Sequence, residues 1–248
     1  TAMSHRLRRS FTDIETKNRE IEQYSVRLEA MVQERTRELD SANISLQDRQ
    51  RQIDREMEMA RRIQLGIIPI PSRHVVHSRL RVATHYQAMQ SVGGDLLDIL
   101  RVGRNKYAFL IADVSGHGVA SALITAMAKV SFMTSVRWGT TPDEVCTRVN
   151  KEMVRLIGDQ GYYISAFLGI LDMETGIIEF CNAGHHPVLH LKEDQSVSVL
   201  DTEGQLLGVW AESSFQTKSE TIVSGERLVL YTDGIIKTRN SEGELFGM

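Results

Sequence analysis

The stretch FLIADVSGHGVASALI, residues 109–124, decides the fold of this chain. An apolar run that predicts a buried strand ends at Asp113, passes through a Ser-Gly-His-Gly turn and enters a run of small residues that predicts a helix. Asp113 could cap that helix. It could instead hold a metal ion at the end of a strand, where rigid elements fix the turns that carry ligands. The stretch therefore predicts a strand, turn and helix with an acidic residue at the turn.

Composition and charge exclude several classes of protein. The chain has 248 residues, of which 42% are hydrophobic, but no apolar run approaches the length of about 20 residues that a membrane span needs. A net charge of -3 without a basic block argues against nucleic acid as the main partner and suits a cation site. Cys146 and Cys181 lack a metal-type spacing. Neither is followed six positions later by an arginine, which cysteine-dependent phosphatases use to hold phosphate. They are predicted to be reduced, buried thiols of a cytoplasmic protein.

The first part of the chain predicts one long helix. Residues 11–67 contain no proline and no glycine except Gly66, and charges of both signs alternate along them. Apolar residues recur at seven-residue intervals in two registers: Ile14, Ile21, Leu28, Ala42 and Ile63 in one, and Val32, Leu39, Leu46, Ile53, Ala60 and Ile67 in the other. This heptad stripe predicts a dimeric coiled coil. Polar residues at the inward positions weaken the pairing: Asn18, Ser25, Arg35, Arg49 and Glu56. A solvated helical spacer without a signalling role is the alternative.

The second part, residues 68–248, predicts a compact domain. Pro69 and Pro71 stop the helix. Short strand-like runs follow, namely LRVATHYQA, KYAFLIADV, ISAFLGILD, GIIEFCNAG, PVLHLK, SVSVL and ERLVLYTDG. Two helices are predicted over residues 120–138 and 142–157, and residues 174–176 have the composition of a hairpin turn. Consecutive hairpins with inserted helices favour an α+β fold with antiparallel sheets over a doubly wound parallel sheet.

Three aspartates follow or interrupt apolar strands and have glycine neighbours or near neighbours: Asp95, Asp113 and Asp233. Carboxylates gathered without arginines repel one another and shift toward protonation unless a cation lies among them. Oxygen ligands favour hard ions, so the set predicts Mg²⁺ or Mn²⁺ rather than zinc.

As an ordered set, several motifs resemble the metal-dependent PPM serine/threonine phosphatases, in the bacterial branch typified by SpoIIE and RsbU. The matching stretches span residues 58–247 and read ARRIQLGIIP, SVGGDLLDI, IADVSGHGVASALI, CNAGHHPVLHL, GQLLGV, LVLYTDGIIKTRN and GELFG. The resemblance implies an α/β/β/α sandwich of two antiparallel sheets flanked by helices, with a site for two Mn²⁺ or Mg²⁺ ions.

By this resemblance, Asp113 bridges both ions and Val114 lends its backbone carbonyl to one of them. Asp95 acts on the same side, through water or the outer coordination sphere, and Asp233 holds the other ion. Asp113 and Asp95 are then the catalytic residues, and a metal-bound water attacks the phosphoryl group without a covalent phosphoenzyme. Members of the family continue past the GELFG segment to a further aspartate ligand, so residues 68–248 are expected to lack the C-terminal metal-ligand segment.

Four other polar residues lie in or near these motifs. His117 could donate a proton to the leaving serine or threonine oxygen, or it could be a structural histidine of the turn. His185 and His186 lie in a loop that would form the rim of the site and approach substrate, although ordinary packing or loop hydrogen bonding is the better explanation for them. We expect Asp98 to support the structure.

The helical part resembles two signalling elements. LRRSFTDIE is similar to the last helix of a HAMP relay domain, and MVQERTRELDSANISL is similar to the signalling helices that follow such domains. The resemblances imply a cytoplasmic homodimer, residues 1–67 forming the coiled coil, with a sensor and an inner-membrane anchor upstream. The implied substrate is a phosphorylated STAS-domain regulator of the anti-sigma-factor-antagonist type.

Two other functions fit some of these residues. A diguanylate cyclase also follows such helices and carries a Gly-Gly-Asp turn, but Gly93 and Gly94 come soon after the helix and the ADVSGHG and YTDG motifs would stay unexplained. A phosphatase-like module without catalysis, which only binds a partner, is the other alternative.

Overall fold

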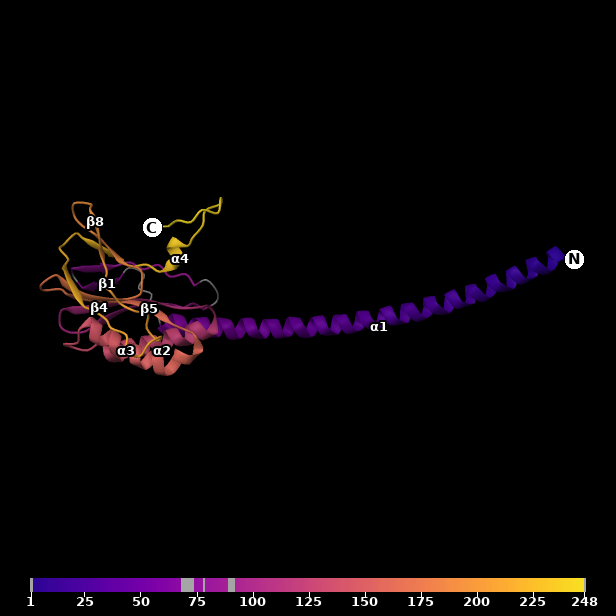
Figure 1. Cartoon of the computed structure of the whole chain (residues 1–248), viewed down its shortest axis with the longest axis horizontal. Helices are drawn as coiled ribbons and strands as arrows, with labels where there is room; N and C mark the ends of the chain where they lie inside the picture. The colour runs from indigo at the N-terminus through magenta and orange to yellow at the C-terminus, as the bar shows by residue number, and fades with distance from the viewer. Residues whose placement is uncertain (1, 68–73, 78, 89–91, 248) are drawn as a thin grey trace. The chain divides into compact units, whose positions relative to one another are not determined.

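A computed structural model describes residues 2–67, 74–77, 79–88 and 92–247 (Figure 1). The chain divides into two compact units, Thr1–Glu56 and Met57–Met248. Helix α1 (Ala2–Ile67) forms the first unit and contributes its last turns to the second. The long helix is thus confirmed and begins earlier than predicted, while Pro69 and Pro71 lie outside the described residues.

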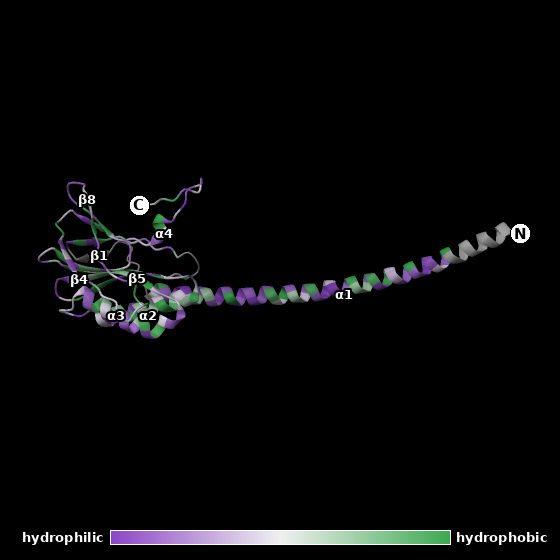
Figure 2. Cartoon of the chain, in the orientation of Figure 1, coloured by the Kyte–Doolittle hydropathy of each residue, from purple (hydrophilic) through white to green (hydrophobic). Residues whose placement is uncertain are grey.

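Within the first unit, the apolar residues of the predicted heptad stripe are on the surface. Ile21 is 64% exposed and Leu39 is 70% exposed, and polar residues separate them along the helix (Figure 2). Pairs of opposite charge at helical spacing, such as Arg35 and Glu38, add little at such exposed positions. A single helix buries no core, so its apolar stripe is free of intrachain packing.

The second unit is built on a five-stranded antiparallel sheet with the order β3-β4-β5-β6-β9. Its strands are β3 (Asp95–Arg101), β4 (Lys106–Val114), β5 (Ile164–Asp172), β6 (Ile177–Ala183) and β9 (Lys218–Thr221). The turn at residues 174–176 joins β5 to β6, as predicted. Buried apolar positions dominate the central strands, as expected for strands covered on both faces.

A second antiparallel sheet has the order β10-β7-β8, with β7 (Val188–Leu191), β8 (Val197–Leu200) and β10 (Arg227–Val229). Val188 and Leu200 from this sheet join one cluster with Phe167 and Phe180 of the larger sheet. A two-stranded sheet pairs β1 (His74–His77) with β2 (Leu80–Val82). The expected pair of packed antiparallel sheets is therefore present.

Helices α2 (Val119–Ser135) and α3 (Pro142–Ile157) cover the other face of the larger sheet (Figure 1). Phe132 of α2 and Met153 of α3 are fully buried against Ala108 and Leu168. A capping box of Thr141 and Glu144 begins α3. A 3₁₀ turn, η1 (Gly158–Gln160), follows it, and a single helical turn, α4 (Asp233–Ile236), lies near the C-terminal end.

Two predicted strands are shorter in the structure. From the run LRVATHYQA only Leu80–Val82 is a strand, and from ERLVLYTDG only Arg227–Val229 is one. The second ends early because Asp233 begins α4, while the hydroxyl of Thr232 donates to the carboxylate of Asp95. This contact bends the chain out of the sheet toward β3.

A buried ion pair fastens α2 to the larger sheet. The Lys129 ammonium of α2 lies 3.2 Å from the Asp98 carboxylate of β3, and the two side chains are only 10% and 3% exposed. Asp98 faces away from Asp95, because the two residues are three positions apart and successive side chains of a strand alternate between its faces. The expectation that Asp98 supports the structure agrees with this position.

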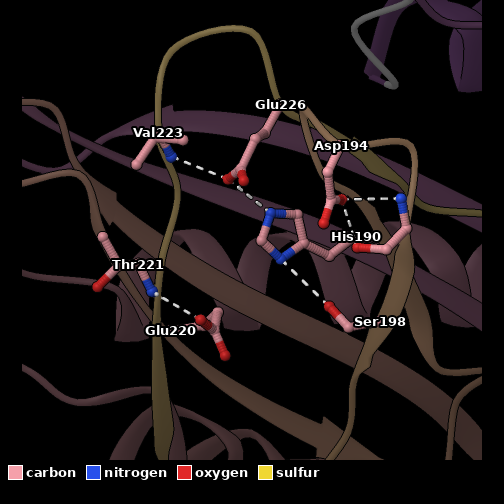
Figure 3. Close-up of polar contacts among 8 residues, drawn as sticks. His190, Asp194, Ser198, Glu220, Thr221, Val223 and Glu226 are labelled. Carbon is pink, nitrogen blue, oxygen red and sulfur yellow. Dashed lines mark hydrogen bonds and ion pairs between the residues drawn. The ribbon is translucent and has the colours of Figure 1, made fainter.

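Another buried network joins β7 to the turn before β10 (Figure 3). The His190 ring is fully buried, with Nε2 at 2.8 Å from Glu226 Oε2 and Nδ1 at 3.5 Å from Ser198 Oγ. The backbone amide of Val223 donates to the same carboxylate and, with His190, lowers the pKa of Glu226. Since His190 is closed off from solvent, this network stabilises the small sheet. Among the described residues, no helix has the length and apolar character needed to cross a membrane.

Candidate active site

The site is built where β3 and β4 lie side by side. Asp95, the first residue of β3, is directly opposite Asp113, the second-last residue of β4. Directly opposite residues point to the same face of a sheet, so the two carboxyl groups meet. Each carboxyl group affects the pKa of the other. The alternative that Asp113 caps the next helix is wrong, because Gly118 holds the N-cap position of α2.

Crowding of carboxylates perturbs both groups. Burial, followed by the charges of Asp95 and Asp233, raises the pKa of Asp113 to about 7, against a weaker opposing effect of Lys237. Burial also raises the pKa of Asp95, although hydrogen bonds from Thr232 and Asp113 oppose this. Two carboxylates this crowded form a site with a deficit of positive charge.

The turn after Asp113 brings backbone close to the carboxylates. The Val114 amide donates to the carbonyl of Gly94 at 3.2 Å, and a Cβ atom on Gly94 would lie 2.5 Å from the Val114 carbonyl oxygen. Only glycine permits this approach. Gly116 and Gly118 have φ angles of 85° and 86°, which lets the turn reverse before α2. The Val114 carbonyl is thus held beside the aspartate pair.

Asp233 reaches the same region from the other end of the sequence. Thr232 Oγ1 donates to Asp95 Oδ2 at 3.0 Å, which anchors the segment carrying Asp233. The Asp233 carboxylate forms an ion pair with Lys237, one helical turn later. Sequence reasoning did not single out Thr232 or Lys237. The sequence does indicate both residues, because Thr232 directly precedes Asp233 and Lys237 follows Asp233 at the i+4 spacing of a helical ion pair.

The three histidines have different environments. His117 is exposed in the turn between Asp113 and α2. His185 is buried, with Nδ1 at 2.9 Å from Ser165 Oγ and Nε2 at 3.1 Å from the Tyr231 carbonyl. Burial, then the neighbouring His186, lowers the pKa of His185 to about 4, so it is neutral at physiological pH. The His186 ring stacks on Tyr231, so the loop packs against the segment that leads to Asp233.

The donor set fits a hard divalent cation. Carboxylate oxygens of Asp95 and Asp113 and the carbonyl of Val114 are the ligands such ions prefer, and a cation would offset the burial and the carboxylate repulsion that raise the pKa of Asp113. Within the described ranges, no group of three or more acidic, histidine or cysteine side chains is close enough to hold a metal ion by itself. Backbone carbonyl and water would therefore complete the coordination.

The raised pKa of Asp113 predicts a pH-dependent stability of the metal-free protein. Between about pH 4, its ordinary value, and about pH 7, the native state binds a proton that the unfolded chain has released. The contribution of Asp113 to the free energy of unfolding therefore falls as pH rises through this window. Urea unfolding in EDTA should show the wild type losing stability relative to Asp113→Asn between pH 5 and pH 8. A difference in the free energy of unfolding between the two proteins that stays constant with pH would show that the pKa of Asp113 is not raised in the native state.

Comparison with protein families identifies the second unit. A family model described as Stage II sporulation protein E (SpoIIE) matches residues 103–248, more than half of the chain. The chain belongs to the SpoIIE family. Asp113, Val114 and Asp233 lie inside the matched region, whereas Asp95 and α1 precede it.

Two curated proteins are similar to this chain over most of its length. Phosphoserine phosphatase RsbP of Bacillus subtilis (strain 168) is 29% identical over 185 residues, which cover 73% of this chain and 45% of RsbP. Phosphoserine phosphatase RsbU of the same organism is 23% identical over 199 residues, covering 79% of this chain and 58% of RsbU. The chain spans about half the length of these curated relatives.

Solved structures confirm the SpoIIE-family fold. The SiaA-PP2C domain of Pseudomonas aeruginosa has a TM-score of 0.67 at 19% identity, over 80% of this chain and 79% of that chain. The RsbU and RsbW domains of Rv1364c from Mycobacterium tuberculosis have a TM-score of 0.55 at 27% identity, over 62% of this chain and 43% of that chain. Both support two antiparallel sheets with flanking helices, as the sequence resemblance implied.

Proposed function

We propose that residues 57–248 form a metal-dependent protein phosphatase that acts on phosphoserine or phosphothreonine. The carboxylates of Asp95 and Asp113, which lie directly opposite each other on β3 and β4 and are crowded enough to perturb each other, carry this proposal. Membership of the SpoIIE family and the similarity to two phosphoserine phosphatases support it.

Each residue of the site has a role in the proposed reaction. Asp113 would contribute to both ions of a Mn²⁺ or Mg²⁺ site, with Asp95 and the Val114 carbonyl on one side and Asp233 on the other. The ions would acidify a water molecule and neutralise charge on the phosphoryl oxygens. Thr232 orients Asp95 through its 3.0 Å hydrogen bond. His117, exposed beside the turn, is our candidate donor of a proton to the leaving oxygen.

One observation favours the alternative of an inactive module that binds a partner. The Lys237 ammonium pairs with Asp233 and already neutralises that carboxylate. Phosphate release from a serine-phosphorylated STAS-type regulator, measured with Mn²⁺ and with EDTA, distinguishes the two functions. The phosphatase requires release that depends on Mn²⁺. Binding of the phosphoprotein without release would establish the inactive module.

We also propose that the first unit pairs with a second copy as a coiled coil and carries a signal from a HAMP-like relay and an anchored sensor. The exposed heptad stripe of α1 supports pairing, and the polar residues in its seam make two registers of similar free energy plausible. Residues 2–56 as one helix span about 80 Å, so the signal would travel as a change in pairing or rotation.

Insertions in α1 test this control. Seven residues inserted after Ser41 keep the phase of the heptad stripe, whereas four residues create a stutter that rotates everything downstream. In the intact receptor, we expect the seven-residue insertion to leave stimulus-dependent phosphatase activity nearly unchanged. The four-residue insertion should fix activity high or low. Equal stimulus responses in both variants would show that α1 is only a spacer.

A further inference from the structure

The last turns of α1 carry a buried polar side chain that the proposed reaction does not use. Gln64 is 7% exposed, and its amide makes two hydrogen bonds to one residue of the second unit. Nε2 donates to the carbonyl oxygen of Gly93 at 2.7 Å, and Oε1 accepts from the amide of Gly93 at 3.1 Å. Because both polar atoms of the Gln64 amide are paired, the side chain holds the Gly93 backbone as a neighbouring strand would.

This attachment lies two residues before Asp95. The next residue, Gly94, accepts hydrogen bonds at its carbonyl from the Val114 amide at 3.2 Å and from Thr125 Oγ1 of α2 at 2.9 Å. Gly94 packs so tightly against the Val114 carbonyl that even a methyl group would not fit. A displacement of Gly93 would therefore act on the segment that places Asp95 beside Val114.

The apolar contact between α1 and α2 is incomplete. A pocket of about 150 Å³ lies between them, lined by Ala60, Ile63 and Gln64 of α1, Val92, and Val119 and Ala122 of α2, among others. Ile63 is 59% exposed and Leu123 of α2 is 62% exposed. Since close apolar packing fixes these turns of α1 only in part, the paired hydrogen bonds of Gln64 determine much of their position.

We propose that Gln64 is a positioning residue that couples the end of α1 to the cation site through Gly93, Gly94 and the placement of Asp95 beside Val114. The inference rests on the proposed function, because the proposed function is what assigns a cation to that site. It gives a physical route by which a change in α1 alters the site without contact between α1 and substrate.

Gln64→Met tests the proposal, because methionine keeps the length and volume of glutamine and removes both hydrogen bonds. Gln47→Met is the matched control at an exposed position of α1. Calorimetric titration at pH 8 should show Mn²⁺ binding at least tenfold weaker in Gln64→Met than in the wild type, and unchanged in Gln47→Met. Half-maximal phosphatase activity should need correspondingly more Mn²⁺, while activity at saturating Mn²⁺ stays within about threefold of the wild type.

A second readout needs no metal. The Val114 amide donates a hydrogen bond to the Gly94 carbonyl. Hydrogen exchange of this amide should be faster in Gln64→Met than in the wild type. Gln64→Glu is the second variant, to be used if the methionine variant fails to fold. It keeps the acceptor for the Gly93 amide and loses the donor to the Gly93 carbonyl, and it should give the same effects. Wild-type Mn²⁺ affinity and Val114 exchange in a folded Gln64 variant would overturn the proposal, as would a wild type that binds no Mn²⁺. Mn²⁺ binding without phosphate release would overturn only the proposed function.

Discussion

Replacing Asp113 with asparagine should slow phosphate release at least about a hundredfold, which corresponds to about 2.7 kcal/mol in activation free energy. The asparagine removes the charge that would bridge the cations, while it keeps nearly the same volume between β3 and β4. The metal-free fold should survive, because the substitution relieves the crowding that raises the pKa of Asp113.

Steady-state phosphate release in the presence of Mn²⁺ measures the effect, with circular dichroism to verify that the variant is folded. Asp172→Asn is a suitable control, because Asp172 lies at the far end of the sheet, at the end of β5. The control should retain nearly full activity. Turnover close to that of the wild type in Asp113→Asn would show that Asp113 is not a metal ligand.

Replacing Lys129 with methionine should lower the free energy of unfolding by about 3–5 kcal/mol, because it leaves the Asp98 carboxylate buried without a partner. Lys151→Met provides the control, since Lys151 is exposed on α3 and its loss should change stability by no more than about 0.5 kcal/mol. Urea denaturation measures both variants.

The double variant Asp98→Asn with Lys129→Met should recover part of the loss, since it removes both charges. A loss below about 1 kcal/mol in Lys129→Met would show that water reaches the Asp98 carboxylate when Lys129 is removed. The result matters for the site, because β3 carries both Asp98 and Asp95. The ion pair of Asp98 with Lys129 attaches β3 to α2 and so helps to position Asp95 at the start of the strand.

The local elements of the site could be predicted from the residues themselves. The apolar run before Asp113 and the two glycines of the turn are local signals, and they correspond to β4 and the start of α2. The hairpin at residues 174–176 could be predicted equally well, because the residues that favour its turn lie within three positions of one another. Such features need no knowledge of distant segments.

The meeting of the aspartates could not be predicted in this way. Asp95 and Asp113 face each other only because the register of β3 and β4 pairs them, and one residue of slip would place their side chains on opposite faces. The approach of Asp233 depends on the hydrogen bond from Thr232 to Asp95, which joins segments more than a hundred residues apart.

The burial of Gln64 could not be predicted for a different reason. A glutamine in a charged helix is typical of a solvated surface, and only the packing of the last turns of α1 against Val92 and α2 shows that it is buried. His185 was ambiguous in the same way, because its burial between Ser165 and Tyr231 depends on tertiary contacts. Buried polar residues are therefore where sequence reasoning was least complete.

Calorimetric titration of Mn²⁺ into the wild type, Asp95→Asn and Asp113→Asn at pH 8 tests the central claim most directly, namely that the paired aspartates form a cation site. The wild type should bind Mn²⁺, binding should weaken at pH 6 as protons compete for Asp113, and Asp113→Asn should lose the site. Identical isotherms for the wild type and Asp113→Asn, or no binding to the wild type, would contradict the claim.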